Sequence, residues 1–419
     1  MLNKKVDNYL NVFGFFLGYP CFYILDSSFT FFLFLLIVIN LPKDSFVGFI
    51  KVNNLGKKAM ALFTITAFLS LLFAPWYDIE LTVKPFKLFI QLIYWNFLVF
   101  FIIEFFETIK WKDFFGYILV GIILQIITFY LVKNLKIDLL LGYILIADER
   151  GRNSFVYQIL ALTPLILYFV LNNKKYTRYY QLTKFGAIIS TLFTNGRAGT
   201  LIIILQVILF SFRKTVFKTG SFIIAVIVIL GILKFYETEV EQTLSNLSDK
   251  IEPYNPRLAL FLKGEAEGTD LSDDRSLLER QIHIQKGFMI FEKHPFLGVG
   301  FGNYGSYSVD LDNILKSEEF ERMAFYSSEQ LNVRSAHNSY IQILSETGII
   351  GLIFFIYILL LILIKLYTRG VMNNFEAAVF LSILGISIHL FAITGAYGAI
   401  TWFVIGIGLA CITKKKIPE

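Results

Sequence analysis

Long apolar runs, separated by short polar breaks, are the feature that most constrains the fold of this chain. Hydrophobic residues make up 56% of the 419 positions, which is more than a soluble domain of this length needs and is typical of a polytopic membrane protein. The runs predict about twelve membrane helices, over residues 10–25, 28–41, 58–75, 86–106, 114–133, 154–171, 183–194, 198–212, 219–235, 341–365, 375–392 and 396–413.

Several runs are shorter than the roughly 20 residues that a simple helical crossing needs. Two pairs of runs are the least clear, 10–25 with 28–41 and 183–194 with 198–212. Each pair is predicted either as two short helices that meet at a polar break or as one long, broken helix.

The distribution of Lys and Arg sets the orientation of the predicted helices. If the N-terminus lies inside, the short outer loops carry few basic residues, namely Lys84, Lys87, Lys133, Lys136, Arg150, Arg152 and Arg197. The inner segments carry many more, including Lys4, Lys5, Lys43, Lys51, Lys57, Lys58, Lys110, Lys112, Lys174, Lys175, Arg178, Lys184, Arg213, Lys214, Lys218, Lys365, Arg369 and Lys414 to Lys416. The positive-inside rule therefore predicts that both termini are cytoplasmic.

This orientation divides the chain into helices one to nine (1–236), an outer loop (237–336) and helices ten to twelve (337–419). The outer loop is rich in Asp and Glu. Within it, residues 276–292 have an apolar face at helical spacing, which predicts an amphipathic helix lying over the membrane or over the bundle.

A glycine-rich stretch, HPFLGVGFGNY, follows that helix at residues 294–304. Pro295 is expected to end the helix, because proline cannot continue it. Gly298, Gly300 and Gly302 predict a turn in which the backbone can approach a ligand closely.

His337 and Asn338 stand directly before the tenth predicted helix. A helix N-terminus has free N–H groups that can hold an anion, and an imidazole at the same place can accept a proton. The plainer interpretation is that the pair simply caps a membrane helix.

Outer arginines supply the second part of a candidate site. Arg197 lies in a tight break, TNGRAG, where a guanidinium beside the membrane needs an anionic partner unless it extends to the interface. Arg280 lies on the amphipathic helix, where a surface salt bridge with Glu279 or Glu292 is the alternative. Arg150 and Arg152 form a second basic spot that could equally be a solvated loop.

One imidazole, several arginines and a helix N-terminus suit a substrate linked through a pyrophosphate. Arginines that neutralise a leaving diphosphate make a metal or other cofactor unnecessary. Two weaker alternatives exist: the D-x-D pattern of Asp310 and Asp312, which many metal-dependent glycosyltransferases share, and the carboxylates Asp78 and Glu80 in another outer loop.

Four more polar residues receive structural interpretations. Glu346 lies about two and a half helical turns after His337 and on the opposite side, so we expect a structural role near Thr347 and Gly348. We interpret His283 and His294 as loop residues. His389 is expected to be a core histidine with satisfied nitrogens.

Three blocks of this sequence resemble the bacterial O-antigen ligase and O-antigen polymerase family. They are TNGRAG at 194–199, the helix and glycine-rich stretch at 280–304, and HNSYIQILSETGIIGL at 337–352. Twelve spans with one large outer loop between the ninth and tenth are also similar to that family. The resemblance covers the whole chain in topology and is sharp in these blocks.

The resemblance implies an all-α integral membrane protein of the GT-C type in the bacterial inner membrane, with its active site facing the periplasm. It implies metal-independent, inverting transfer from an undecaprenyl-diphosphate-linked glycan. By this resemblance Arg197 and Arg280 would hold the diphosphate and His337 would activate the acceptor hydroxyl. Arg275 is a near rival of Arg280, and Arg334 is a further candidate from its position.

The leading functional prediction is an O-antigen ligase, which transfers O-antigen to a sugar hydroxyl of lipid A–core in lipopolysaccharide biosynthesis. The alternative is a polymerase, whose acceptor is a second lipid-linked repeat unit. A transporter for lipid-linked sugar is a third hypothesis, although carboxylates that could bind coupling ions are nearly absent from the predicted spans. Besides these substrates the expected partners are membrane lipids, and no nucleic acid is expected.

Overall fold

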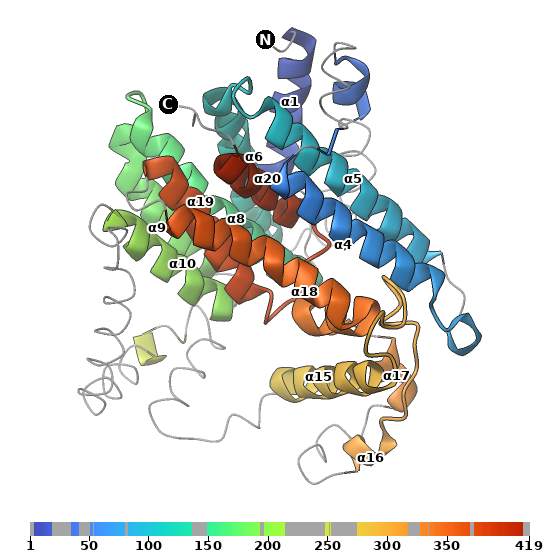
Figure 1. Cartoon of the computed structure of the whole chain (residues 1–419). Helices are drawn as coiled ribbons and strands as arrows, with labels where there is room; N and C mark the ends of the chain where they lie inside the picture. Colours follow the sequence, from blue (N-terminus) through green and yellow to red (C-terminus); the bar gives the residue numbers. More distant parts are fainter. Residues whose placement is uncertain are drawn as a thin grey trace.

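The structure is a computed structural model, and it describes residues 4–18, 35–41, 51–52, 54–79, 83–135, 149–192, 197–213, 248–250, 252, 275–316, 327–333, 335–368 and 373–413. Over these residues the chain is helical, apart from turns, loops and one isolated β-bridge between Ile79 and Tyr307. The apolar helices form a bundle, and α15 lies at one end of it beside α18 (Figure 1).

The apolar helices follow the predicted runs closely. Their bounds are α1 Lys4–Gly18, α4 Leu55–Leu72, α5 Lys84–Phe105, α6 Trp111–Leu135, α8 Glu149–Asn172, α9 Tyr180–Leu192, α10 Arg197–Ser211, α18 Ser339–Tyr367, α19 Asn374–His389 and α20 Ala399–Thr413. The remaining elements are α15 Arg275–Lys293, α16 Asp312–Leu315, α17 Ser328–Asn332 and the short 3-10 helices Trp76–Asp78 and Thr177–Tyr179.

Three of the described helices, α4, α5 and α18, are long and apolar enough to cross a membrane. An all-helical membrane protein is therefore supported, whereas the number of twelve spans stays a prediction. The predicted run 219–235 lies outside the described residues, and so does the boundary at residue 236. The first helix begins at Lys4, earlier than the apolar run that predicted it.

The structure decides between the two alternatives for the predicted runs 183–194 and 198–212, which correspond to helices α9 and α10. They are two separate helices rather than one broken helix, and they pack against each other. The Thr200 hydroxyl at the start of α10 donates to the Thr191 carbonyl at the end of α9 over 3.2 Å. Lys184 and Ser211, at the two other ends, lie 3.4 Å apart (Nζ to Oγ). The pair is thus an antiparallel hairpin, and Arg197 is the first residue of its second helix.

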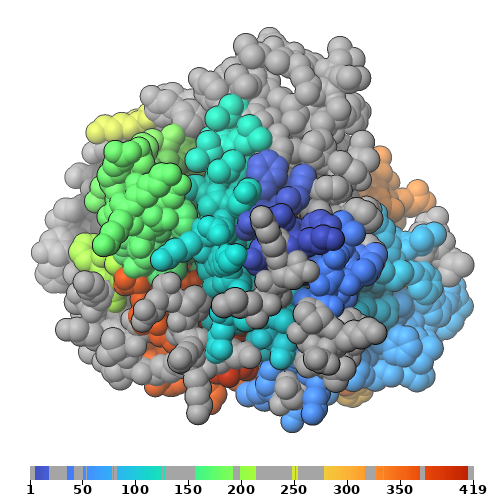
Figure 2. All heavy atoms as spheres, turned by 90° about the horizontal axis from the view of Figure 1, so that it is seen from above, coloured from blue at the N-terminus to red at the C-terminus, as the bar shows by residue number. Residues whose placement is uncertain are grey.

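The helices of the bundle pack in pairs, α1 against α6, α5 against α20, α8 against α19 and α4 against α18. Figure 2 shows α1 in dark blue beside the teal surface of α6. The ring of Trp402 on α20 is fully buried and lies 5.8 Å from Phe63 of α4 and 6.1 Å from Phe355 of α18, between ring centroids. Lipid is as apolar as these side chains, so close packing rather than the hydrophobic effect holds such helices together.

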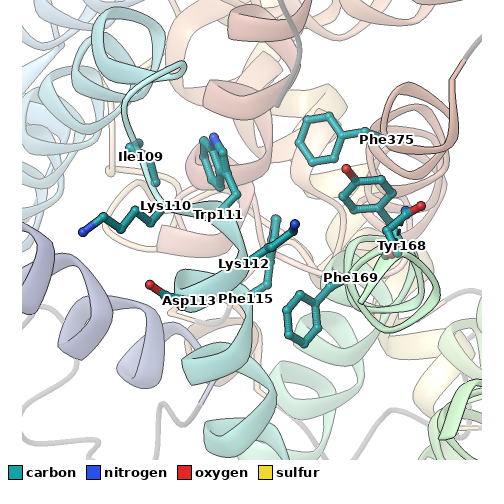
Figure 3. A pocket seen from close by; sticks show the side chains of 10 residues that line it. Ile109, Lys110, Trp111, Lys112, Asp113, Phe115, Tyr168, Phe169 and Phe375 are labelled. Atoms are coloured by element: carbon teal, nitrogen blue, oxygen red, sulfur yellow. Dashed lines mark hydrogen bonds between the residues drawn. The ribbon is translucent and has the colours of Figure 1, made fainter. Parts of the chain in front are cut away.

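The end of the bundle where α6 and α19 begin and α8 ends contains a cavity of about 330 Å³. Trp111, Phe115, Phe169 and Phe375 surround the side chain of Lys112 there (Figure 3). The neighbouring Lys110 forms an ion pair with Asp7 of α1 at 2.6 Å. Helix α19 begins at this cavity and ends beside the first turn of α18, so the cavity and His337 lie at opposite ends of the bundle.

The predicted amphipathic helix is confirmed as α15, and it lies over the bundle, against α18. The closest approach is at Gly287, where an added Cβ would stand 2.1 Å from Cγ2 of Ile341. The buried face is not purely apolar: His283 and Lys286 are fully buried, whereas Gln285 and Met289 are half-buried. Glycine is needed at the crossing because any side chain would push α15 away from α18.

Candidate active site

Helix α18 contains a break at Gly348, whose φ of 65° and ψ of −170° are not helical. The glycine-rich stretch 294–304 fills the break with its backbone. The N–H groups of Val299 and Gly300 donate to the carbonyls of Ser345 and Glu346 over 2.9 and 3.0 Å, and the Ile349 N–H donates to Pro295 over 2.9 Å. The interrupted helix therefore leaves these backbone groups paired, as a membrane segment requires.

Glycine is necessary on both sides of this contact. A Cβ on Gly348 would lie 2.1 Å from the Phe296 carbonyl oxygen, and one on Gly298 would lie 2.4 Å from the Ser345 oxygen. Both residues also have positive φ, which favours glycine. The close backbone approach predicted for the glycine turn is present, but it is made to α18. These contacts give the glycines a structural role, and a ligand at the turn stays a prediction.

Glu346 holds the same turn through its side chain. Its carboxylate, 1% exposed, accepts hydrogen bonds from the N–H groups of Gly302 (2.9 Å) and Tyr304 (3.3 Å), from Nε2 of Gln342 (2.9 Å) and from the Tyr397 hydroxyl. We call these five residues the carboxylate network. The predicted structural role of Glu346 is consistent with this network, although its partners are the glycine turn and Tyr397 rather than Thr347.

Lys286 links the glycine turn to α17 through hydrogen bonds. Its Nζ is fully buried and donates to the carbonyls of Tyr304 (2.8 Å) and Asn332 (2.6 Å). Burial, with a smaller effect of the Lys84 charge, lowers the pKa of Lys286 to about 7. The glycine-rich stretch 294–304 is thus held to α18 by a carboxylate and to α17 by an amine.

The first turn of α18 is locked against the end of α19. The Asn338 side chain accepts from the N–H groups of Tyr340 (3.0 Å) and Ile341 (3.1 Å), so the capping interpretation describes this residue. The Ser339 N–H donates to the Leu390 carbonyl over 2.8 Å. The position of residue 337 is therefore set by two helices together.

His337 precedes this cap with a φ of 51°, a left-handed conformation that is uncommon for a residue other than glycine. Its side chain is half-buried, and its ring centroid lies 5.8 Å from that of His283 on α15. Non-glycine residues in this conformation concentrate at functional sites, where surrounding contacts hold them. Here the N-cap at Asn338 and the ring of His283 are those contacts.

Arg280 lies on α15 one turn before His283, and its side chain is half-buried. Its charge acts electrostatically on His389, the last residue of α19. The same His389 ring packs against α10: a Cβ on Gly199 would stand 3.3 Å from its Cε1 atom. Gly199 is two residues after Arg197, whose side chain lies outside the described residues. The structure thus brings α15, the end of α19 and the first turn of α10 together.

The start of α8 is at the same end of the bundle. Val156 of α8 faces Gly199 so closely that a Cβ on the glycine would overlap its side chain. Arg150 and Arg152 belong to the first turn of α8, and their side chains are outside the described residues, as is all of Arg334. The N-termini of α8, α10 and α18 lie at this end of the bundle, and each carries a partial positive charge. An anion is the ligand that such an end favours.

Two histidines that the sequence analysis set aside are part of this arrangement. His283 is a fully buried helical residue, so its interpretation as a loop residue is wrong. His389 is a core residue, but both of its ring nitrogens lack a hydrogen-bond partner among the described residues, as do those of His283. We call His283, His337 and His389 the histidine cluster: the rings of His283 and His337 lie 5.8 Å apart, and the charge of Arg280 acts on His389. The one sequence signal for His283 was its place one helical turn after Arg280.

The alternative acidic sites receive little support. The Asp310 carboxylate accepts from the Asp312 N–H over 2.9 Å, which makes a local turn before α16. The side chain of Asp78 and all of Glu80 lie outside the described residues. Among the residues that the structure describes, no group of three His, Cys, Asp or Glu side chains is placed to hold a metal ion.

Comparison with known families found one match. Residues 182–356 match the family model described as O-antigen ligase. The match covers less than half of the chain and includes α9, α10, α15, the glycine turn and α18 beyond its break. Over this segment the predicted family resemblance is confirmed, and it supports an enzyme of the O-antigen ligase type, similar to membrane glycosyltransferases. A comparison with proteins of curated function found no match.

Proposed function

We propose that this chain is an O-antigen ligase, which transfers a glycan from undecaprenyl diphosphate to a sugar hydroxyl of lipid A–core. The observation that carries the proposal is the meeting of His337, the α15 turn of Arg280 and the first turn of α10 at one end of the bundle. These elements come from three segments distant in sequence, and all three fall in the segment that matches the family model.

In the proposed reaction His337 accepts the proton of the acceptor hydroxyl. The hydroxyl oxygen forms a bond to C1 of the donor glycan, and the bond between C1 and the phosphate oxygen breaks. The electron pair of that bond leaves on undecaprenyl diphosphate, and the configuration at C1 inverts. An imidazole suits the role of general base because it titrates near neutral pH.

Arg197 and Arg280 are proposed to bind the diphosphate. A guanidinium makes two parallel hydrogen bonds to a phosphate and keeps its charge at any physiological pH. The N-termini of α8, α10 and α18 at this end of the bundle support the same anion. Between the rivals on α15 we prefer Arg280 to Arg275, because Arg280 is one turn from the ring that contacts His337.

The setting in the membrane completes the proposal. The basic residues predicted to be cytoplasmic include Lys110 and Lys112, which lie at the end opposite to His337. This arrangement supports a site that faces the periplasm of the inner membrane, with both termini in the cytoplasm, in a GT-C-type fold of about twelve spans.

The polymerase reaction is the second candidate, because it shares the donor and differs in the acceptor. The family description favours the ligase. The transporter hypothesis is weakened by the carboxylate network: the buried carboxylate of α18 is engaged by four donors, which leaves it poorly suited to bind a coupling ion.

A reconstituted assay tests the proposal. Purified protein in detergent is mixed with undecaprenyl-diphosphate-linked glycan, EDTA, and either lipid A–core or a second lipid-linked repeat. Glycan on lipid A–core is the expected result. Lengthening of the lipid-linked chain instead would identify a polymerase, and no product from folded protein would contradict both reactions.

A further inference from the structure

His283 is the buried group that the proposed reaction does not use. Its side chain is 0% exposed, and neither ring nitrogen has a hydrogen-bond partner among the described residues. The large majority of buried polar side chains in native proteins are paired, and an exception needs an explanation. The Tyr304 hydroxyl donates to the His283 carbonyl over 2.7 Å, so the backbone at this point is firmly held.

The ring of His283 lies near both an acid and the proposed base. Its Nε2 is 3.7 Å from Oε1 of Glu279, one turn earlier on α15. Its ring centroid is 5.8 Å from that of His337, with the ring planes at 44°. Glu279 and His337 are both partly exposed, whereas the ring of His283 is shielded from water.

The contact between α15 and α18 brings His283 close to His337. Gly287 of α15 touches Ile341 and Ser345 of α18, and the Ser345 hydroxyl donates to the Gly287 carbonyl over 3.2 Å. Four residues earlier on each segment are His283 and His337. One turn is about four residues, so the same crossing that packs Gly287 sets the two rings side by side.

His337 stands at the N-terminus of α18, which carries a partial positive charge. The charged groups of α15 near His283 include Glu279, Arg280 and Lys286, and Lys286 is turned to the Tyr304 and Asn332 carbonyls. Glu279 is the acidic side chain that α15 places against the His283 ring.

We propose that His283 is a positioning residue that couples the Glu279 carboxylate to His337 and so stabilises the imidazolium formed during glycosyl transfer. The inference rests on the proposed function. The acceptor proton stays on His337 until it is released to solvent, and neither His283 nor Glu279 changes its covalent state. A base oriented by a second group that is itself held by an acid is a recurrent arrangement in catalysis.

The first test needs no donor or acceptor. Diethyl pyrocarbonate acylates neutral imidazole. The intact full-length protein is modified at a series of pH values and then digested, and the rate of His337 modification is measured by mass spectrometry. A plot of this rate against pH gives the midpoint of the His337 titration. Glu279→Gln is expected to move that midpoint down by about half a unit to one unit, because it removes a nearby opposite charge. Glu292→Gln, an exposed position on the same helix, is the matched control and should leave it unchanged. An unchanged midpoint in folded Glu279→Gln would overturn the proposal.

The second test uses glycosyl transfer. His283→Phe is expected to lower kcat about 10- to 100-fold with the KM for donor unchanged, since a positioning group acts in the transition state. His283→Gln, which keeps hydrogen-bonding groups, should recover part of the loss. His294→Gln, at the other end of α15, serves as the control. Normal kcat in folded His283→Phe would contradict the proposal.

The two tests distinguish a failure of the proposed coupling from a failure of the proposed function. If wild-type protein transfers no glycan but Glu279→Gln still moves the His337 midpoint, the proposed function fails and the coupling stands. If transfer occurs and the midpoint does not move, the coupling fails and the function stands. Glu279 is partly exposed, so its variant remains a decisive test even where variants of the buried His283 do not fold.

Discussion

The carboxylate network and the histidine cluster both join α15 or its glycine turn to α18, yet they treat buried polar groups in opposite ways. Glu346 is buried with four donors on its carboxylate. His283 and His389 are buried with no hydrogen bond on any ring nitrogen within the described residues. A buried carboxylate with all its donors in place holds a fold in one shape, whereas a buried imidazole without a partner needs an explanation, of which a role in binding or reaction is one.

The contrast predicts two kinds of mutant. Changes in the carboxylate network should affect stability first, and changes in the histidine cluster should affect activity first. The following experiments test this division, from the largest expected effect to the smallest.

His337→Ala should lower the rate of glycosyl transfer by about 10²- to 10⁴-fold, the range that a general base contributes. Thermal stability in detergent should stay close to that of the wild type, because the side chain is half-buried and stands before the helix cap. Initial rates and unfolding temperatures of the purified proteins check both statements, with His294→Ala as control. A well-folded His337→Ala protein of near-normal activity would remove the base from the mechanism.

Glu346→Leu should destabilise the protein by about 3 kcal/mol or more, because it leaves buried donors without an acceptor at about 1–3 kcal/mol each. Thermal unfolding should then occur roughly 5–10 °C lower. Glu292→Leu, on the exposed end of α15, is the control. If Glu346→Leu unfolds like the wild type but is inactive, Glu346 acts in the reaction like the histidine cluster. The division between a stabilising network and an active cluster is then wrong.

Arg197→Lys and Arg280→Lys should each reduce transfer about 10- to 100-fold with little change in stability. A lysine keeps the charge but loses the two parallel hydrogen bonds of the guanidinium fork to phosphate. The loss should be visible in binding of undecaprenyl diphosphate by the purified variants, with Arg178→Lys, at the opposite end of α8, as control. Full activity of both lysine variants would mean that simple charge is sufficient.

Lys286 provides the smallest expected effect. Its pKa is lowered to about 7 in the folded protein, so between about pH 7 and pH 10 the unfolded chain binds more protons and stability rises with pH. Below pH 7 the amine is charged in both states and this dependence vanishes. The unfolding temperature from pH 7 to 9 should therefore rise more in the wild type than in Lys286→Met. Lys293→Met, as the control, should keep the wild-type slope of unfolding temperature against pH. If Lys286→Met had that same slope, the lowered pKa of Lys286 would be contradicted.

Much of the fold could be predicted because it depends on local properties of the chain. The apolar runs from 58 to 212 and from 341 to 413 became helices with bounds shifted by a few residues. The amphipathic pattern of 276–292 predicted α15 and, as one of two alternatives, its place over the bundle. Arg280 and His337 were proposed as site residues from residue type and position; their role stays a prediction, and the structure packs α15 against α18 with His283 beside His337.

The roles of Glu346, His283 and the glycine turn were not predictable in the same way. Helical periodicity placed Glu346 away from His337, which is consistent with the structure, but it could not reveal that the carboxylate reaches the N–H groups of Gly302 and Tyr304. Nor could it show that α18 breaks at Gly348, because the break depends on a loop more than forty residues earlier.

By itself the sequence determined a helical membrane protein and an amphipathic helix, and it singled out basic and imidazole side chains as candidates for a site. Each of these follows from side-chain type at a fixed spacing along one segment. The tertiary structure decided which polar groups are paired, since a hydrogen bond joins atoms from different segments and its partners are settled only when those segments pack. For this chain that decision separates the paired Glu346 from the unpaired His283 beside His337.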